Sequence, residues 1–253
     1  MADFASIPGG SGAPLAFDAV PKNIDAFYHI DTSHFVLLTD RTGDSTVDAT
    51  GQDGGLLLGL GKGDDTAATG DGDDVVLGGN GADAISTGAG DDLVLAGGGA
   101  DTVTLGDGDD AAFGGAGADN LYGQAGDDTL SGDNGDDFVA GGAGDDLLLG
   151  GAGADTLSGG TGDDLLAGGA GGDTFIFGND FGHDTVTDFG PGDKLQFAAD
   201  LNGSGIQVPS DLVQFVSGGA GVTKIVIGDS TVILQGTDKD DFLAHLSAKV
   251  QII

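Results

Sequence analysis

Residues 141–167 read GGAGDDLLL, GGAGADTLS and GGTGDDLLA, three nonapeptides with glycine, aspartate and leucine at matching positions. The nine-residue period extends to both sides of this stretch, and each aspartate follows a glycine two positions earlier and precedes an apolar residue two positions later. The aspartates are Asp65, Asp74, Asp83, Asp92, Asp101, Asp110, Asp119, Asp128, Asp137, Asp146, Asp155, Asp164 and Asp173. The glycines are Gly63, Gly72, Gly81, Gly90, Gly99, Gly108, Gly117, Gly126, Gly135, Gly144, Gly153, Gly162 and Gly171.

Glycine and aspartate at this spacing have the chemistry of a calcium-binding turn. Glycine tolerates positive φ and lets backbone carbonyls point inward, and calcium takes about six to eight oxygen ligands. The first six residues of each nonapeptide predict a turn. The last three predict a short strand, and its central apolar residue points inward because side chains alternate along a strand. Two nonapeptides form one coil of 18 residues, so successive turns stack alternately on two edges.

The pattern GGxGxDxUx, in which U is apolar, resembles the calcium-binding nonapeptide repeat of the RTX (repeats-in-toxin) family over a little under half of the chain. By this resemblance the repeat aspartates and glycines bind Ca²⁺ between stacked turns of the same edge. Seven turns on one edge leave six gaps and six turns on the other leave five, so at most eleven ions fit between repeat turns.

The predicted fold class is all-β. We expect a right-handed parallel β-roll, a two-sheet solenoid with 18 residues per coil, between a small N-terminal cap and a β-rich C-terminal cap. The expected domains are an N-terminal β cap or association segment over residues 1–50, the calcium-binding roll over 51–177, and a capping and secretion-signal region over 178–253. Residues 51–59 keep the frame but have Leu56 where aspartate should stand, which indicates a degenerate first coil.

Composition narrows the function classes. The chain has 253 residues, 42 of them acidic and all aspartate, against 7 Lys and Arg, which gives a formal net charge of −35. Such a chain is a poor partner for nucleic acid, because phosphate binding needs basic side chains. Cysteine is absent, which excludes disulfides and thiolate metal sites. No apolar run approaches the ~20 residues of a membrane span, and Met1–Phe4 shows no basic segment typical of a secretory signal peptide.

The two expected sheets differ in their outward residues. Strands of one sheet are apolar outward, apart from Thr129 and Ser131, whereas strands of the other carry mainly Thr, Ser and Asn. The apolar outward residues are Val75, Leu77, Leu93, Leu95, Phe113, Leu147, Leu149 and Leu165. Contiguous exposed apolar patches usually mark an interface. We therefore expect this face either to mediate association or to be covered by residues 1–50 and 200–253.

The period ends at Asp173. Residues 173–195 resemble the segment that closes the roll in serralysin-type and other type I-secreted RTX proteins, and this resemblance implies that Asp184 and Asp188 help bind a final ion. Plain turn aspartates remain the alternative. Residues 222–235 predict a β-hairpin, and Thr237 with Asp240 predicts a capping box that starts a short helix reaching Val250. The acidic-then-apolar C-terminus is similar to a type I secretion signal.

The N-terminal segment predicts two short strands, over residues 26–30 and 35–38. His29 and His34 match no standard metal motif, so ordinary histidines are the favoured interpretation.

Two functional hypotheses follow. The first is a secreted, calcium-binding structural protein that folds outside the cell and self-associates into a surface layer, filament or matrix. The second is a monomeric calcium-dependent adhesin or glycan-binding accessory module.

We expect no enzyme, since the sequence contains no His-Glu-x-x-His, Gly-x-Ser-x-Gly or P-loop motif. Expected partners are other copies of the chain, cell-surface glycan and the type I secretion machinery, with no nucleic acid, no membrane span and no cofactor besides Ca²⁺. The expected location is extracellular or on the cell surface, of a Gram-negative bacterium.

Overall fold

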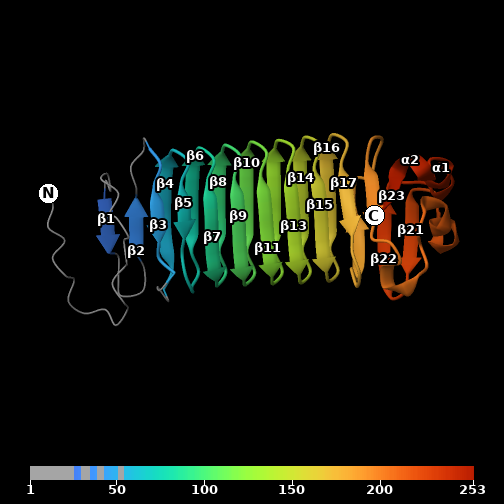
Figure 1. Ribbon diagram of the computed structural model, residues 1–253, viewed down its shortest axis with the longest axis horizontal. Coiled ribbons are helices and arrows are strands. Elements are labelled where there is room, and N and C mark those ends of the chain that lie inside the picture. Colours follow the sequence, from blue (N-terminus) through green and yellow to red (C-terminus); the bar gives the residue numbers. More distant parts are fainter. Residues whose placement is uncertain (1–25, 30–34, 39–42, 51–53) are drawn as a thin grey trace.

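The computed structural model describes residues 26–29, 35–38, 43–50 and 54–253. Two sheets run along the molecule, with 13 strands in sheet A and 10 in sheet B, and their strands stack along the long axis (Figure 1). The predicted parallel β-solenoid is confirmed. No helix in the described part of the chain is long and apolar enough to cross a membrane.

The strands of sheet A, in spatial order, are β1 (Ala26–His29), β2 (Phe35–Leu38), β4 (Leu56–Lys62), β6 (Val75–Asn80), β8 (Leu93–Gly98), β10 (Ala111–Ala116), β12 (Thr129–Asn134), β14 (Leu147–Ala152), β16 (Leu165–Ala170), β18 (His183–Val186), β22 (Ser230–Gln235), β21 (Val222–Ile227) and β20 (Val216–Gly219). Those of sheet B are β23 (Val250–Ile252), β19 (Lys194–Phe197), β17 (Thr174–Phe177), β15 (Thr156–Thr161), β13 (Phe138–Ala143), β11 (Asn120–Ala125), β9 (Thr102–Asp107), β7 (Ala84–Ala89), β5 (Thr66–Ala68) and β3 (Thr46–Asp48). The helices are two 3₁₀ segments (Leu201–Gly203, Pro209–Phe215), α1 (Lys239–Ala244) and α2 (Leu246–Lys249).

The register confirms the 18-residue coil. In sheet A, Ala112 pairs in parallel with Val94 on one side and Leu130 on the other. These central apolar residues point inward and are fully buried between the sheets, as the alternation of side chains along a strand requires. Each strand of the repeat contributes about one large side chain to the core, so the core is thin.

The stacked strands begin before the roll boundary expected from the sequence. Strand β3 lies within residues 1–50 and pairs in parallel with β5, and β2 pairs in parallel with β4. The two predicted N-terminal strands are present as β1 and β2, which pair antiparallel. His34 and the side chain of His29 lie outside the described residues. Leu56 takes the position of a repeat aspartate and is buried.

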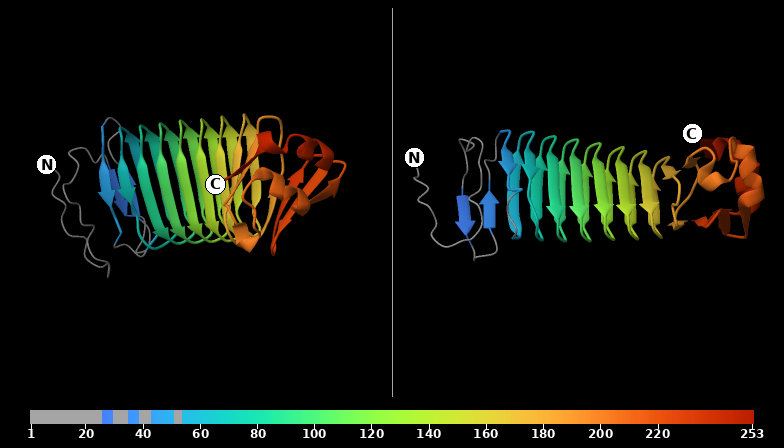
Figure 2. Two further views of the ribbon diagram at one scale, coloured as in Figure 1. Left: turned by 45° about the vertical axis from the view of Figure 1, so that its right-hand side comes forward. Right: turned by 60° about the horizontal axis from the view of Figure 1, so that its bottom comes forward.

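The C-terminal region folds against the end of the roll (Figure 2). The predicted hairpin is confirmed as β21 and β22, and β22 continues sheet A beside β18. The predicted capping box was wrong. Asp238 is the N-cap of α1 and accepts the Asp240 amide at 2.9 Å, whereas Thr237 is buried and its hydroxyl donates to the Phe189 carbonyl. The predicted helix also ends early, because Val250 starts strand β23.

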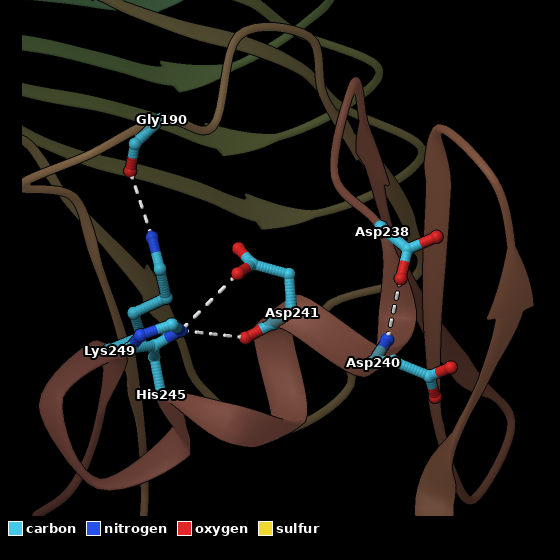
Figure 3. Close-up of polar contacts among 6 residues, drawn as sticks. All are labelled: Gly190, Asp238, Asp240, Asp241, His245 and Lys249. Carbon is cyan, nitrogen blue, oxygen red and sulfur yellow. Dashed lines mark hydrogen bonds and ion pairs between the residues drawn. The ribbon is translucent and has the colours of Figure 1, made fainter.

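Lys249 fixes α2 to the segment that closes the roll. Its ammonium donates to the Gly190 carbonyl at 2.9 Å (Figure 3). It also lies 4.6 Å from the centre of the Phe189 ring. Nearby, His245 Nδ1 lies 2.9 Å from the Asp241 carbonyl and 3.4 Å from its carboxylate. These contacts serve the packing of the C-terminal cap, since a cation over an aromatic ring is favourable.

The outward face of sheet A carries the apolar columns expected from the sequence. Leu77, Leu95 and Phe113 are register partners, and so are Val75 and Leu93. Leu77 and Leu95 remain 41% and 40% exposed. The C-terminal region packs at the end of the roll and leaves this face open (Figure 1). Of residues 1–50, the other expected cover, strands β1, β2 and β3 continue the sheets, and the remaining residues up to 42 lie outside the described part of the chain.

Candidate metal centre

The repeat aspartates form two internal rows, one along each edge of the roll. All thirteen are at most 3% exposed. From Asp83 to Asp173 the Oδ1 atom accepts the backbone N–H of the equivalent aspartate one coil earlier, and at the start of the rows Asp65 and Asp74 accept the amides of Ser45 and Leu56. Asp110, for example, donates to Asp128 at 2.9 Å, and Asp119 donates to Asp137 at 2.8 Å. One oxygen of each carboxylate therefore ties consecutive coils together.

The second oxygen, Oδ2, is left without a hydrogen-bond partner among the described residues in nearly every repeat aspartate. It is buried in all of them from Asp83 to Asp173 and in Asp65. The exception is Asp74, whose Oδ2 lies 3.5 Å from the Gly70 amide nitrogen. A buried carboxylate oxygen without a donor is costly, so twelve such atoms in regular rows require a shared explanation.

In several turns, backbone carbonyls converge with these free oxygens beside the glycine that stands five positions before the repeat aspartate. A Cβ built on Gly114 would lie 2.5 Å from Asp119 Oδ2 and 2.9 Å from the Gly132 carbonyl oxygen. On Gly150 it would lie 2.6 Å from both Asp155 Oδ2 and the Gly168 carbonyl oxygen. Two acceptors that face one point repel each other unless a cation lies between them. In these turns glycine leaves the space open, whereas the other five turns carry a side chain at the same position: Leu60, Thr69, Thr87, Ala96 and Leu105.

The glycine two positions before each aspartate is required for a different reason, which is its backbone conformation. All thirteen of these residues have positive φ, between 116° at Gly72 and 151° at Gly171. This region strains any residue with a side chain. At Gly117 an added Cβ would also collide with the carbonyl of Gly99 in the preceding coil. The predicted glycines therefore shape the turns and let them stack closely.

Burial raises the pKa of every repeat aspartate above its usual value. Removal from water is the largest cause, and neighbouring carboxylates contribute to the shift in most of them. The pKa rises to about 6 in Asp92, Asp101, Asp110, Asp128, Asp155 and Asp164, and to about 7 in Asp146. A bound cation would reverse this shift, because an opposite charge favours the ionised carboxylate.

The first aspartate of each DD pair, which precedes the buried repeat aspartate, has another task. These residues are exposed, and their Oδ1 atoms accept a backbone N–H from the next coil. Asp109 accepts from Asp127 at 2.9 Å, and Asp145 accepts from Asp163 at 2.8 Å. They form an outer row whose hydrogen bonds run opposite to those of the inner row. Their exposed position and these hydrogen bonds account for them as turn residues, so no bound metal is needed to explain them.

Asp184 and Asp188, which follow the end of the nine-residue period, differ from each other. Asp184 continues an inner row, because it accepts the Asp164 amide at 3.1 Å, is buried, has a free Oδ2 among the described atoms and has a pKa raised to about 8, mainly by burial. Asp188 lies outside the rows, since its two oxygens accept the amides of Gly168 and Gly169. A role for Asp184 and Asp188 in binding a final ion stays a prediction.

Sequence reasoning missed Asp193. This residue continues the other inner row and accepts the Asp173 amide at 3.0 Å. It follows a spacing of 20 residues rather than 18. The signal was the buried Leu195 two positions after it, as in the nonapeptide, whereas Pro191 stands where the nonapeptide has glycine.

The donor set fits calcium. It consists of carboxylate and carbonyl oxygens, which hard divalent cations prefer. Within the described ranges, no group of three or more His, Cys, Asp or Glu side chains converges as it would at a zinc centre. A site built from one repeat carboxylate and several backbone carbonyls does not need three such side chains to converge. The Oδ2 atoms and the neighbouring glycine carbonyls would hold the ions, which would supply positive charge between acceptor oxygens.

These features define a calcium-binding parallel β-roll, and the comparisons with known proteins agree with that class. The family model of the RTX calcium-binding nonapeptide repeat (4 copies) matches residues 61–94, 77–112, 86–121, 113–148, 140–175 and 149–186, which together span about half of the chain. The chain belongs to the RTX calcium-binding nonapeptide-repeat family. A comparison with curated proteins gives no match.

Two solved structures show partial similarity. The crystal structure of the extracellular lipase LipA from Serratia marcescens matches with 22% identity over 73% of this chain and 40% of the lipase, with a TM-score of 0.42. The solution structure of the AlgE6R3 subunit of the mannuronan C5-epimerase from Azotobacter vinelandii matches with 25% identity over 56% of this chain and 71% of the subunit, with a TM-score of 0.23. This chain thus spans less than half of the lipase, and neither likeness carries an argument about activity.

Acid should partly replace calcium. Because the folded pKa values of residues such as Asp146 and Asp184 are raised above 3.8, the folded chain binds more protons than the unfolded chain between about pH 4 and pH 8. This contribution to stability is complete at low pH and is lost as the pH rises through the folded pKa values. We expect the metal-free chain to gain strand signal in circular dichroism from about pH 8 to pH 5. High salt at pH 8, which screens charge without protonating carboxylates, should achieve less. A metal-free chain equally unfolded at both pH values would contradict this linkage.

Proposed function

We propose that the protein is a secreted, non-enzymatic structural component that folds on calcium outside the cell and self-associates through the outward face of sheet A. The supporting observation is the pair of apolar columns on that face. Leu57, Leu77, Leu95, Leu149 and Leu165 are each between 37% and 42% exposed. Large apolar side chains gathered on one flat face favour association.

Charge also favours this face as the place where two copies meet. In a chain with a net charge of −35, most surfaces repel a second copy. The two outward columns from β4 to β16 contain Leu, Val, Ala, Phe, Gly, Thr and Ser, and no charged residue. The carboxylates of the repeat lie in the turns at the edges, and the one carboxylate within strands β4 to β16 of sheet A is Asp133 on β12, beside the two columns, which accepts the Ser131 hydroxyl at 2.7 Å. A face-to-face pair therefore separates the charged edges from the contact.

The two outward columns on sheet A together form an apolar strip, and its area sets the expected strength of association between two copies. Seven strands spaced about 4.8 Å apart give a strip roughly 30 Å long, and with a width of about 15 Å it would bury about 900 Å² in total, below the ~1,200–2,000 Å² of stable complexes. A single pair should therefore be weak. Many copies held in a layer, filament or matrix would gain strength from multiple contacts.

Two double variants test the proposal. Leu93→Asp with Leu95→Asp places charge on the strip, and Thr102→Asp with Thr104→Asp adds the same charge to the next strand, on the opposite sheet. With calcium, light scattering coupled to size-exclusion chromatography should show concentration-dependent association of wild type and of the threonine variant, and monomers of the leucine variant. The proposal fails if the compact leucine variant associates like wild type. It also fails if wild type stays monomeric at high concentration.

The calcium-dependent adhesin or glycan-binding module remains the second candidate. One observation favours it, the exposed aromatic pair on sheet B that is analysed below. Secretion by a type I machinery and an extracellular or cell-surface location of a Gram-negative bacterium belong to both candidates and remain proposals. They are supported by the RTX repeats, which are typical of secreted proteins, and by the low affinity of extracellular calcium modules, with dissociation constants of about 0.1–1 mM.

A further inference from the structure

Sheet B carries an aromatic pair in the middle of an otherwise small-residue face. Tyr122 on β11 and Phe138 on β13 have ring centres 5.6 Å apart, with planes tilted by 46°. Tyr122 is 37% exposed and Phe138 is half-buried. Strands β11 and β13 are neighbours near the centre of the roll. The rings therefore form a raised apolar platform on a flat surface.

Gln124 occupies a strained position on the same face and the same strand as Tyr122. Its register column reads Gly88, Gly106, Gln124, Gly142 and Gly160, and all five residues have positive φ. Gln124 has φ of 85° and an exposed side chain. A side chain in this region costs free energy that glycine avoids, and such strain concentrates at functional sites. Asp133 holds the equivalent position on β12 of sheet A with φ of 69°, and its carboxylate accepts the Ser131 hydroxyl. The part of the chain that the structure describes shows no comparable side-chain hydrogen bond for Gln124.

Amide and hydroxyl groups surround the platform. Asn120 and Gln124 lie on either side of Tyr122 along β11, and all three alternate outward. Thr104 and Ser158 lie in the same register row, on β9 and β15. Planar amides beside an exposed ring provide donors and acceptors around an apolar contact. That combination suits a ligand with hydroxyl groups around a ring of C–H bonds.

Charge and size exclude the other ligand classes. The sequence has no Lys or Arg between Lys62 and Lys194, so an anionic polymer would meet only repulsion at the centre of the roll. Two rings cover far less than the ~800 Å² per partner of a stable protein interface. A neutral sugar chain fits both the charge and the size of the site, because it is uncharged and presents one sugar ring at a time to the aromatic pair.

We propose that Tyr122, Phe138, Asn120 and Gln124 form a binding site for a neutral glycan on the outward face of sheet B. The aromatic rings would stack against the C–H face of a sugar ring, since the negative face of an aromatic ring attracts such weakly positive edges. The amides would hydrogen-bond its hydroxyls. This site is on the sheet opposite the proposed association face and does not depend on self-association.

Native gel electrophoresis with calcium, in gels that contain hydroxyethyl cellulose, galactomannan or soluble starch, tests the site. We expect at least one neutral polysaccharide to retard the wild-type chain, and hyaluronate, an anionic chain, to have no effect. Tyr122→Ala should weaken binding about tenfold. This variant should fold, because Ala140 occupies the same register position on β13. Ser86→Ala, two coils away on the same face, should bind normally.

Gln124→Gly gives the sharpest test. Restoring the glycine of the column should raise the thermal midpoint of the calcium-loaded chain and, by removing the amide, weaken glycan binding. If Gln124 had only a structural role, its replacement by glycine would not both raise the thermal midpoint and weaken glycan binding. Leu93→Asp with Leu95→Asp should retain binding, which separates this site from the association face. The proposal is overturned if no neutral polysaccharide retards wild type, or if Tyr122→Ala or Gln124→Gly binds as wild type does.

Discussion

Chelation of calcium at neutral pH is expected to convert the roll into an expanded chain without regular strands. The internal rows would then place ionised carboxylates within about one coil spacing of each other, with free Oδ2 atoms and no counter-charge. The thin core cannot offset this cost, because each repeat buries about one apolar side chain of moderate size. At about 1 mM calcium and a dissociation constant of about 0.1 mM, each ion adds about 1.4 kcal/mol, so several ions match the stability of a whole domain.

Circular dichroism and small-angle scattering across a calcium titration would measure this transition. We expect the strand signal to appear together with compaction, and magnesium at the same concentration to be less effective because it demands stricter octahedral geometry. A compact, strand-rich chain in excess chelator at neutral pH would contradict the expectation. The upper limit of eleven ions between repeat turns remains a prediction that the same titration can check.

Gly117→Ala should cost about 3–5 kcal/mol of the free energy of unfolding with calcium present. Gly117 has φ of 143°, and an added Cβ would meet the Gly99 carbonyl of the preceding coil. Backbone on both sides must shift, and the shift would disturb the turn that contains Asp119. Urea denaturation and the calcium midpoint should both reveal the loss.

Gly98→Ala is the matched control. Gly98 lies outside the positive-φ region, and the nearest atom to an added Cβ is Asn80 Oδ1 at 3.7 Å. The equivalent position one coil later is Ala116. This variant should be neutral or stabilising by about 0.5 kcal/mol, because alanine restricts the unfolded chain. If both variants lose the same stability, close stacking of the turns is not the reason for the regular spacing of glycine in this sequence.

The repeat made the roll predictable, because one nonapeptide specifies its turn, its strand and its stacking partner in every coil. The aspartates, the glycines and the apolar face of sheet A followed from the same period. Asp193 and β3 did not, since they keep the stacking of the roll while leaving the nine-residue spacing. The N-cap was misplaced by one residue, because Thr237 and Asp238 are both good capping residues and tertiary packing buried the threonine.

Other features need coordinates. The sequence shows pairs of adjacent aspartates but not that one of each pair turns inward and the other outward, with hydrogen bonds running in opposite directions. It also shows Gln124 as a departure from the repeat without showing that its backbone stays in the glycine conformation.

The central claim is that ions complete the internal rows by binding the free oxygens of the repeat aspartates. Anomalous scattering from crystals grown with calcium, with terbium as a stronger substitute, measures the ion positions directly. We predict peaks along both edges of the roll, each in contact with the Oδ2 atom of an inner aspartate such as Asp119 or Asp128 and with glycine carbonyls. Peaks confined to the exposed outer aspartates, with none beside the inner Oδ2 atoms, would contradict the account.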